Sequence, residues 1–144
     1  MIQRKQSIFL LLAVAINALL FYLPVYTFTP DLTLPDTAIH PYLISANALL
    51  AIINGAIGVL SLISIFLYKN RNVQIRVGNL SMLLTALLAG LLFFVADTIS
   101  KSMNQRVDFM IGSYLPLIEI VFLFIAVRFI KKDETLVRSA DRLR

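Results

Sequence analysis

Residues 109–128 read Phe109-Met-Ile-Gly-Ser-Tyr-Leu-Pro-Leu-Ile-Glu119-Ile-Val-Phe-Leu-Phe-Ile-Ala-Val-Arg128. This stretch holds one acidic side chain, Glu119, and it is long enough to cross a bilayer, which takes roughly 20 residues of helix. A tail follows, Lys131–Arg144, which together with Arg128 carries six of the 13 lysines and arginines. An apolar segment that ends in basic residues predicts a transmembrane helix whose last turn lies at the cytoplasmic face.

The composition of the chain excludes an ordinary soluble domain. Apolar residues make up 59% of the 144 residues and charged residues 15%, against about 45–50% and about 25% in soluble proteins. The charges gather between apolar runs, whereas a soluble amphipathic helix carries polar residues along one face at every turn. The sequence therefore predicts a membrane protein that contacts the lipid bilayer over most of its length.

Four apolar runs define four predicted spans, at about 7–26, 43–68, 78–97 and 109–130. The first run also fits a secretory signal peptide, but it is longer than the usual apolar region of about 7–15 residues and lacks a convincing cleavage site. Between the first two spans, Pro30, Pro35 and Pro41 predict an irregular loop, because proline interrupts a helix. The predicted fold is all-α: a polytopic four-transmembrane-helix bundle of residues 1–130 with short loops, followed by the basic tail 131–144.

The distribution of lysine and arginine predicts the orientation. The N-terminal start, the segment 69–76 and the segment from Arg128 onward hold 11 of these residues, and the other two connections hold two. Such an excess over short loops marks the cytoplasmic side, so we expect both termini in the cytoplasm. The same rule explains the isoelectric point near 9.8 without a nucleic-acid partner.

Polar side chains within the spans are candidates for a functional site. If each span is centred on the membrane, Asn17, Asn54 and Glu119 lie at nearly the same depth. Asn47 and Ser61 extend this pattern, since Asn47, Asn54 and Ser61 recur every seven residues along one face of the second span. One interpretation is a midplane site for a proton, an ion or a small substrate. The other, which we favour on sequence alone, is a packing contact in which a neutral Glu119 hydrogen-bonds the two asparagines.

The depth of Glu119 depends on where its helix begins. A start near Asp108 places Glu119 centrally and puts Pro116 inside the helix. A start at Ser113 makes Pro116 a first-turn residue and raises Glu119 toward the outer surface. We expect the first arrangement, because the span then has full length and ends at Arg128.

The tail has a weak helical pattern, since Leu136, Ala140 and Leu143 fall at helical spacing. It predicts either a short amphipathic helix on the inner surface or a solvated end. Anionic lipid headgroups are the expected partners of its basic residues, and a cytoplasmic protein could dock on the same groups. These inner-surface contact residues are Lys131, Lys132, Arg138, Arg142 and Arg144.

No catalytic motif is present. The chain has no cysteine, and its one histidine, His40, has no nearby cluster of candidate metal ligands. A phosphate-binding glycine loop, a nucleophile elbow and a His-Glu zinc motif are all missing. We therefore expect a protein that is not an enzyme and that binds no metal or cofactor.

Both ends of the chain carry distinctive sequence: Met1-Ile-Gln-Arg4 leads into Ser7-Ile-Phe-Leu-Leu-Leu-Ala13, and the chain closes on Leu136-Val-Arg-Ser-Ala-Asp-Arg-Leu-Arg144. These ends resemble an uncharacterised membrane family of Bacteroidetes, catalogued as domain of unknown function 4293. The Asp-Arg-Leu-Arg ending is the most specific part, and the resemblance covers the whole chain. It implies a four-helix protein of the bacterial inner membrane and supplies no activity, substrate or site residue.

Two functions are consistent with these features. The first, favoured by the small size and short loops, is an accessory or structural subunit of a larger membrane assembly, of a respiratory or protein-translocating type. Its partners would be other membrane-protein subunits. The alternative is a small transporter or proton-coupled carrier that uses Glu119 with Asn17 and Asn54.

Overall fold

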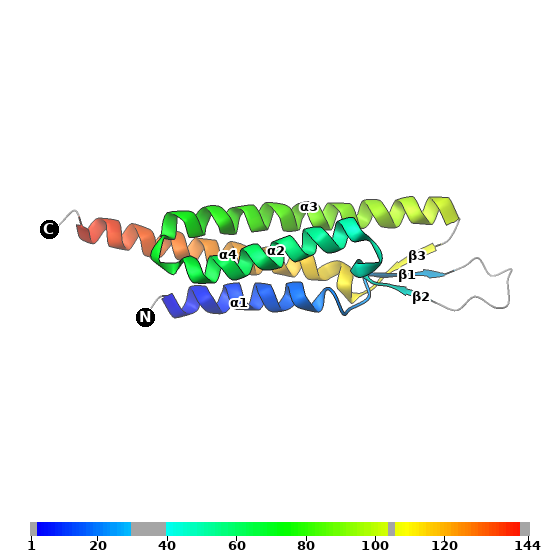
Figure 1. Cartoon of the computed structure of the whole chain (residues 1–144), viewed down its shortest axis with the longest axis horizontal. Coiled ribbons are helices and arrows are strands. Elements are labelled where there is room, and N and C mark those ends of the chain that lie inside the picture. The colour runs from blue at the N-terminus through cyan, green and yellow to red at the C-terminus, as the bar shows by residue number, and fades with distance from the viewer. Residues whose placement is uncertain (1–2, 30–39, 104–105, 142–144) are drawn as a thin grey trace.

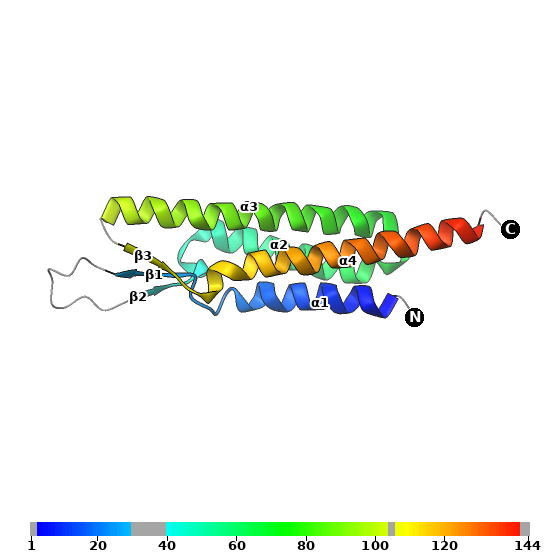
Figure 2. The same ribbon diagram turned by 180° about the vertical axis from the view of Figure 1, so that it is seen from behind.

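The computed structural model describes residues 3–29, 40–103 and 106–141, and it is an antiparallel bundle of four helices. Figures 1 and 2 show that the first and last helices start and finish at the same end of the bundle, here called the terminus end. The opposite end carries three short strands and is called the sheet end. The helices are α1 (Gln3–Leu19), α2 (Ala48–Phe66), α3 (Arg71–Met103) and α4 (Ile111–Asp141), with 3-10 turns at Ile44–Ala46 and Leu67–Lys69.

The three strands form an antiparallel sheet in the order β2-β1-β3. They are β1 (Tyr26–Thr29), β2 (His40–Tyr42) and β3 (Arg106–Phe109), with Tyr26 opposite Tyr42 on one side and opposite Phe109 on the other. The expected all-α fold with irregular loops is thus corrected at this end. The sequence Tyr26-Thr-Phe-Thr29 consists of aromatic and β-branched residues that favour strands. Pro41 is tolerated because β2 is an edge strand.

An aromatic cluster holds the sheet together. The rings of Tyr26 and Tyr42 stack at a centroid distance of 4.7 Å, and Phe28 packs edge-on against both. Tyr26 is fully buried, and this burial, with a smaller contribution from Tyr42, raises the pKa of its phenol above the usual range. The sheet is therefore packed together by aromatic rings at this end of the bundle.

The sheet connects directly to α4 through the backbone. The Met110 amide donates to the carbonyl of Val25 at 2.9 Å, and the Gly112 amide donates to the carbonyl of Pro24 at 3.0 Å. The hydroxyl of Ser113 donates to the same Val25 carbonyl. A Cβ at Gly112 would lie 2.5 Å from the Pro24 oxygen, so this approach requires glycine.

The first predicted span is shorter than expected. Helix α1 ends at Leu19, seven residues before the predicted end at Tyr26, because the chain turns ahead of Pro24 and then enters β1. Within the described ranges, three helical segments are long and apolar enough to span a membrane, at Ala48–Lys69, Arg71–Ser102 and Ile111–Val137, and α1 contributes a shorter apolar segment, Gln6–Leu19. The chain is a mostly helical, multi-pass membrane protein.

The last two helices are longer than predicted. Helix α3 begins at Arg71 instead of near residue 78, so most of the basic segment 69–76 is helical. Helix α4 continues through the tail to Asp141, and the tail is neither a separate surface helix nor an unstructured end over this range. No glycine or proline interrupts the sequence after Arg128, so nothing stops the helix there. Residues 142–144 lie outside the described part.

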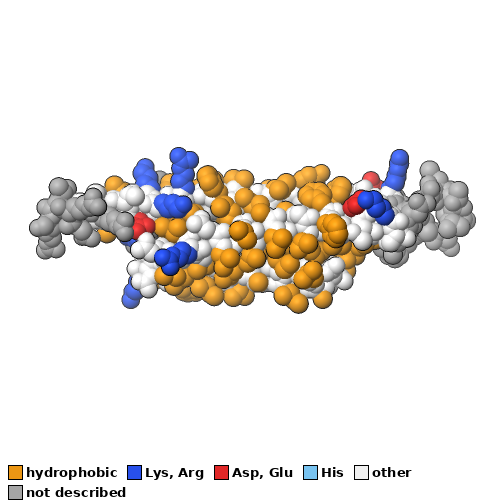
Figure 3. Space-filling view, turned by 90° about the horizontal axis from the view of Figure 1, so that it is seen from above, with side chains coloured by type: hydrophobic (Ala, Val, Ile, Leu, Met, Phe, Trp, Pro, Cys, Tyr) orange, Lys and Arg blue, Asp and Glu red, His pale blue; other side chains and the backbone are white. Residues whose placement is uncertain are grey.

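The outer surface of the bundle is apolar between two charged ends (Figure 3). Large hydrophobic side chains such as Leu83, Phe94 and Val121 are more than half exposed along the helices. Lysine and arginine side chains gather near both ends of the surface that Figure 3 shows. This pattern places lipid against the middle of the bundle.

Candidate functional site

Asn17 of α1 and Asn54 of α2 form a buried hydrogen-bonded pair. The Nδ2 of Asn17 donates to the Oδ1 of Asn54 at 2.8 Å, and the Nδ2 of Asn54 donates to the backbone carbonyl of Asn17 at 3.2 Å. Gly58, one turn further along α2, makes room for this pair, because a Cβ there would lie 2.6 Å from the Oδ1 of Asn17. The structure thus brings together two of the three predicted midplane residues.

Glu119 of α4 is fully buried beside this pair. The Asn17 amide is the polar group that interacts with its carboxyl group, but outside hydrogen-bonding geometry, and neither carboxyl oxygen has a hydrogen-bond partner in the described part of the chain. Glu119 therefore lies close to Asn17 without joining the hydrogen-bonded asparagine pair.

Glu119 lies near the middle of its helix. Helix α4 begins at Ile111, between the two alternative starts, so Glu119 follows by eight residues, or about 12 Å. Ile130, the last buried apolar residue of this helix, lies 11 residues further on, or about 16 Å. Pro116 is inside the helix, so the carbonyl of Gly112 lacks its usual intrahelical donor.

The level of Glu119 relative to α3 follows from one close contact. A Cβ at Gly78 of α3 would lie 2.7 Å from the Cγ2 of Val127, so these two residues are opposite each other. Because α3 and α4 run in opposite directions, Glu119, eight residues before Val127, lies level with residue 86. Thr85, which is fully buried, is therefore at the depth of Glu119.

A row of buried polar side chains continues from this level toward the terminus end. We call it the polar seam, and its members belong to α2 and α3. Its members are Ser61, Ser64, Gln74, Ser81 and Thr85. Sequence analysis identified only Ser61 of these; the spacing of Gln74, Gly78, Ser81 and Thr85 by four, three and four residues is the signal that could have shown the rest.

The hydrogen bonds of the polar seam are mostly to the backbone. The hydroxyl of Thr85 donates to the Ser81 carbonyl at 2.8 Å, and Gln74 Nε2 donates to the Ser64 carbonyl at 2.9 Å. The hydroxyls of Ser61 and Ser64 are buried without a hydrogen-bond partner in the described residues. The seam therefore keeps unused hydrogen-bonding capacity inside the bundle.

The helix interior on the other side of Glu119 is mostly apolar. Toward the sheet end, the same face of α3 carries Leu88, Leu92 and Ala96. Leu20, directly after α1, and Leu50 of α2 belong to the same apolar cluster. The buried polar residue of α4 on this side, Ser113, donates its hydroxyl to the Val25 carbonyl, so the continuous row of polar side chains runs from Glu119 toward the terminus end.

Asn47 has a different role from its predicted partners. It precedes α2 as its N-cap, and its Oδ1 accepts hydrogen bonds from the amides of Leu49 at 3.0 Å and Leu50 at 3.4 Å. The three residues of the seven-residue repeat therefore differ in role, because Asn47 is a helix cap whereas Asn54 and Ser61 are buried within α2.

The predicted inner-surface residues are only partly described. Lys131 and Lys132 are exposed on α4, the side chain of Arg138 lies outside the described part, and so do Arg142 and Arg144. Sequence analysis did not predict the contacts that the acidic residues beside them make with α3.

Asp133 and Glu134 join α4 to α3 at the terminus end. Arg71 Nη2 lies 3.2 Å from Asp133 Oδ2 without hydrogen-bonding geometry, while its Nη1 donates to the Asp133 carbonyl at 3.0 Å. The Asn72 amide, with its nitrogen toward Glu134, lies 2.5 Å from Oε1. These contacts hold α4 against the start of α3 at the terminus end.

Comparisons with known proteins identify a family and no activity. Residues 2–143 match the family described as "Domain of unknown function (DUF4293)". No curated protein and no solved structure matches the chain. Among the described residues, no three histidine, aspartate or glutamate side chains gather where they could hold a metal ion. The match spans nearly the whole sequence, so this small membrane protein belongs to the DUF4293 family.

Proposed function

We propose that this protein is a small proton-coupled carrier in which the Glu119 carboxyl group binds and releases a proton. The observation that supports this most directly is that Glu119 is fully buried, with no hydrogen-bond partner for either oxygen among the described residues. An ionised carboxylate is costly inside a bilayer, so an unpaired one favours the neutral, proton-bearing form. Release of that proton then requires water or a cationic substrate to reach the site.

The packing alternative explains Glu119 less well. It required the carboxyl group to hydrogen-bond Asn17 and Asn54, but neither Glu119 oxygen has a hydrogen-bond partner among the described residues. The two asparagines hydrogen-bond across α1 and α2 without Glu119. A buried polar group without partners weakens a fold by about 1–3 kcal/mol, so a purely structural role would favour an apolar residue here.

The direction of access follows from the polar seam. The hydroxyl and amide groups between Glu119 and the terminus end can hydrogen-bond water, whereas Leu88, Leu92 and Leu50 close the sheet end. Glu119 would therefore exchange its proton with the terminus end in this conformation. With both termini in the cytoplasm of a bacterial inner membrane, as the basic residues predict, that route leads to the cytoplasm.

Proton movement across vesicles tests this proposal. The purified protein is reconstituted in liposomes that contain a pH-sensitive dye, and the internal pH is followed after an external pH step. We expect Glu119→Gln to abolish the protein-dependent pH change while the helix content and the unfolding midpoint remain the same. Asp97→Asn is the matched control, because Asp97 is an exposed carboxylate at the sheet end. Unchanged proton movement in Glu119→Gln would overturn the proposal.

Single cysteines test the direction of access, since the chain has none of its own. We expect a cysteine at position 81 in the seam to react with a water-soluble thiol reagent faster than a cysteine at position 92. Both positions are buried, so a difference in reaction rate would reflect access of water to the interior and not a position on the surface of the bundle. Equal protection at both positions would contradict a hydrated seam.

An accessory subunit is the second candidate function, and the end of α4 favours it. Leu136 and Val137 are 48% and 45% exposed, beyond the Arg71–Asp133 contact. Apolar side chains on a projecting helix beside exposed lysines suit a docking contact with another subunit. Removal of residues 136–144 should preserve membrane insertion and release partner subunits that otherwise remain bound in native mass spectrometry. A full-length protein that carries no partner after gentle extraction would exclude this role.

A further inference from the structure

The row of α3 residues that contributes to the polar seam ends in a charged side chain. Steps of three and four residues place these side chains on one face of the helix: Arg71, Gln74, Gly78, Ser81 and Thr85. Arg71 is the first residue of α3 and lies one turn beyond Gln74 toward the terminus end. On this helix the seam therefore leads to a guanidinium group.

Helix α4 carries a matching row that begins at Glu119. Steps of four and three residues lead from it to Asp133, through the buried apolar side chains of Leu123, Ala126 and Ile130. Asp133 is only 8% exposed, and it and Glu119 are the two buried acidic residues in the described part of the chain. They share one face of α4 and lie 14 residues, or about 21 Å, apart.

The two rows meet at the terminus end through Arg71 and Asp133. Their side chains approach to 3.2 Å, and the guanidinium group also donates to the Asp133 carbonyl. One turn further into the bundle, Gln74 donates to the Ser64 carbonyl and forms the last level of the polar seam. The charged pair therefore lies between the end of the seam and the water outside.

The Arg71–Asp133 pair is suited to opening and closing. The two side chains are 23% and 12% exposed, so water reaches them and can replace their contact. Ion pairs near a surface contribute little to stability, so separating this one costs little. Asp133 Oδ2 also accepts no hydrogen bond from the described residues, so no further donor fixes the carboxylate in place.

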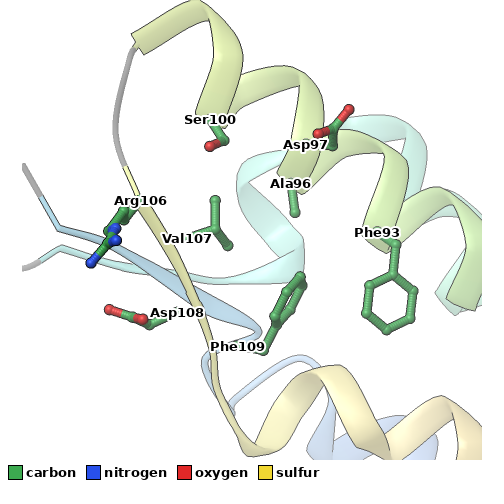
Figure 4. Close-up of a pocket in the computed structure, with 8 residues that line it drawn as sticks. All are labelled: Phe93, Ala96, Asp97, Ser100, Arg106, Val107, Asp108 and Phe109. Carbon is green, nitrogen blue, oxygen red and sulfur yellow. The ribbon is translucent and has the colours of Figure 1, made fainter.

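The hollow at the other end of the bundle stops short of Glu119 among the described residues. A cavity of about 450 Å³ lies at the sheet end between α3 and β3, and Figure 4 shows the residues that line it. Its innermost residue on α3, Phe93, is about 10 Å beyond residue 86, which is level with Glu119. Leu88 and Leu92 are buried between these two levels. The contact that separates the seam from water is thus at the terminus end.

We propose that Arg71 and Asp133 form a gate that controls the access of water and protons to Glu119, an inference that rests on the proton-carrying function proposed above. When the pair is formed, it covers the end of the polar seam. When it separates, water enters along the hydroxyl and amide groups of the seam. Asn72 and Glu134, whose side chains meet beside the pair, hold α3 against α4 in the closed form.

Thiol labelling measures the gate without proton movement. A single cysteine at position 81 reports water in the seam, and a single cysteine at position 126 reports the apolar contact between α1 and α4; both positions are buried. We expect Arg71→Gln and Asp133→Asn each to raise the labelling rate at position 81 about fivefold, as loss of one ordinary charged contact changes an opening equilibrium. Position 126 should keep its rate. The matched control is Lys132→Gln, an exposed cation beside Asp133, which should change neither rate.

Two results of this labelling would overturn the proposal. Equal acceleration at positions 81 and 126 would mean that the whole end of the bundle loosens. No acceleration at position 81 would mean that the pair does not cover the seam. The exchanged variant, Arg71→Asp with Asp133→Arg, keeps one charge of each sign and should restore slow labelling, whereas continued fast labelling would count against a gate controlled by charge.

A reversible crosslink tests the gate during transport. Cysteines at positions 72 and 134 are joined by a short bifunctional methanethiosulfonate, which holds α3 and α4 together beside the pair. We expect the pH change in liposomes to slow severalfold and to recover when the crosslink is reduced. Cysteines at positions 9 and 129 are the control, because Phe9 and Phe129 already stack at 5.6 Å between α1 and α4, and joining them should not slow transport.

The two experiments separate the gate from the carrier function. Unslowed transport with the 72–134 crosslink would overturn the gate and leave the role of Glu119 intact. A wild-type protein that moves no protons would refute the carrier function, and labelling at position 81 would still show whether the Arg71–Asp133 pair covers the seam.

Discussion

Two of the helix contacts in the terminus half of the bundle differ in chemistry. Between α1 and α4 the buried apolar side chains are Leu10, Ala13, Leu123, Ala126 and Ile130. The buried polar residue in this contact, Gln6, donates to the Phe129 carbonyl at 3.3 Å. On α2 and α3 the buried polar side chains of this half form the polar seam. Both contacts have the same lipid outside, so the difference is not imposed by the membrane.

This difference separates a contact built for stability from one that can change. Small and large apolar side chains between α1 and α4 interlock, and close packing drives helix association in lipid. Hydrogen bonds between membrane helices contribute only about 0.6 kcal/mol on average. The interior along the polar seam is therefore the part of the bundle that can admit water, and Glu119 lies near its inner end, close to Asn17.

The largest expected effect comes from placing a polar group in the apolar contact. Leu123→Asn puts an amide without partners where Leu123 is fully buried. We expect it to lower the free energy of unfolding by about 2–5 kcal/mol, from the lost packing and the unpaired amide. Leu123→Met is the control and should cost less than about 1.5 kcal/mol. Unfolding in dodecyl sulfate, followed by circular dichroism, measures both; equal midpoints would show that this contact is not the stable one.

A smaller effect is expected where the asparagine pair depends on space. In Gly58→Val the new side chain would occupy the position of the Asn17 amide, 2.6 Å from the Cβ. We expect a loss of about 1–3 kcal/mol from overpacking. The control is Gly55→Val, one turn earlier on α2, where a Cβ meets nothing within 4 Å. A result in which both variants lose the same stability would mean that the helix, and not the pair, is sensitive to valine.

The number and order of the helices could be predicted from the sequence, but several of their ends could not. Apolar runs report burial in lipid, and this information is present in composition alone. Helix α3 extends beyond its apolar run at both ends because Arg71 and Lys101 are good helix formers in water. Helix α1 is shorter than its run, since Val25 and Tyr26 pack as well in a buried strand as in a helix.

The depth of the candidate site residues in the membrane could be predicted from the sequence, but the hydrogen bonds between them could not. Equal depth of Asn17, Asn54 and Glu119 follows from centring each run in the bilayer. Which side chains hydrogen-bond depends on rotation of each helix about its axis and on the space at Gly58, and neither can be obtained from spacing along the chain. The cavity at the sheet end was hidden for a related reason, because it depends on β3, which the sequence analysis treated as a loop.

A double-mutant cycle measures the asparagine pair itself. Asn17→Ala, Asn54→Ala and the double variant are compared with the wild-type protein in the same unfolding measurement. We expect a coupling energy of about 0.6 kcal/mol and no more than about 1.7, because each asparagine left alone also has backbone groups nearby. Adding Glu119→Gln to the cycle should leave the coupling unchanged, since no hydrogen bond joins Glu119 to the pair. If the coupling energy disappears with Glu119→Gln, Glu119 would instead have a structural role in packing with the asparagine pair.

The smallest expected effect on stability is in the polar seam. Ser61→Ala removes a buried hydroxyl that has no hydrogen-bond partner in the described residues, so the free energy of unfolding should stay within about 0.5 kcal/mol or rise slightly. Ser113→Ala is the contrasting variant, since its hydroxyl donates to the Val25 carbonyl and its loss should cost about 1 kcal/mol. If the seam carries water to Glu119, Ser61→Ala should nevertheless slow the pH change in liposomes, because one polar group along the route is lost. A variant that is destabilised by as much as Ser113→Ala would instead assign the Ser61 hydroxyl to packing and remove the distinction between the two helix contacts.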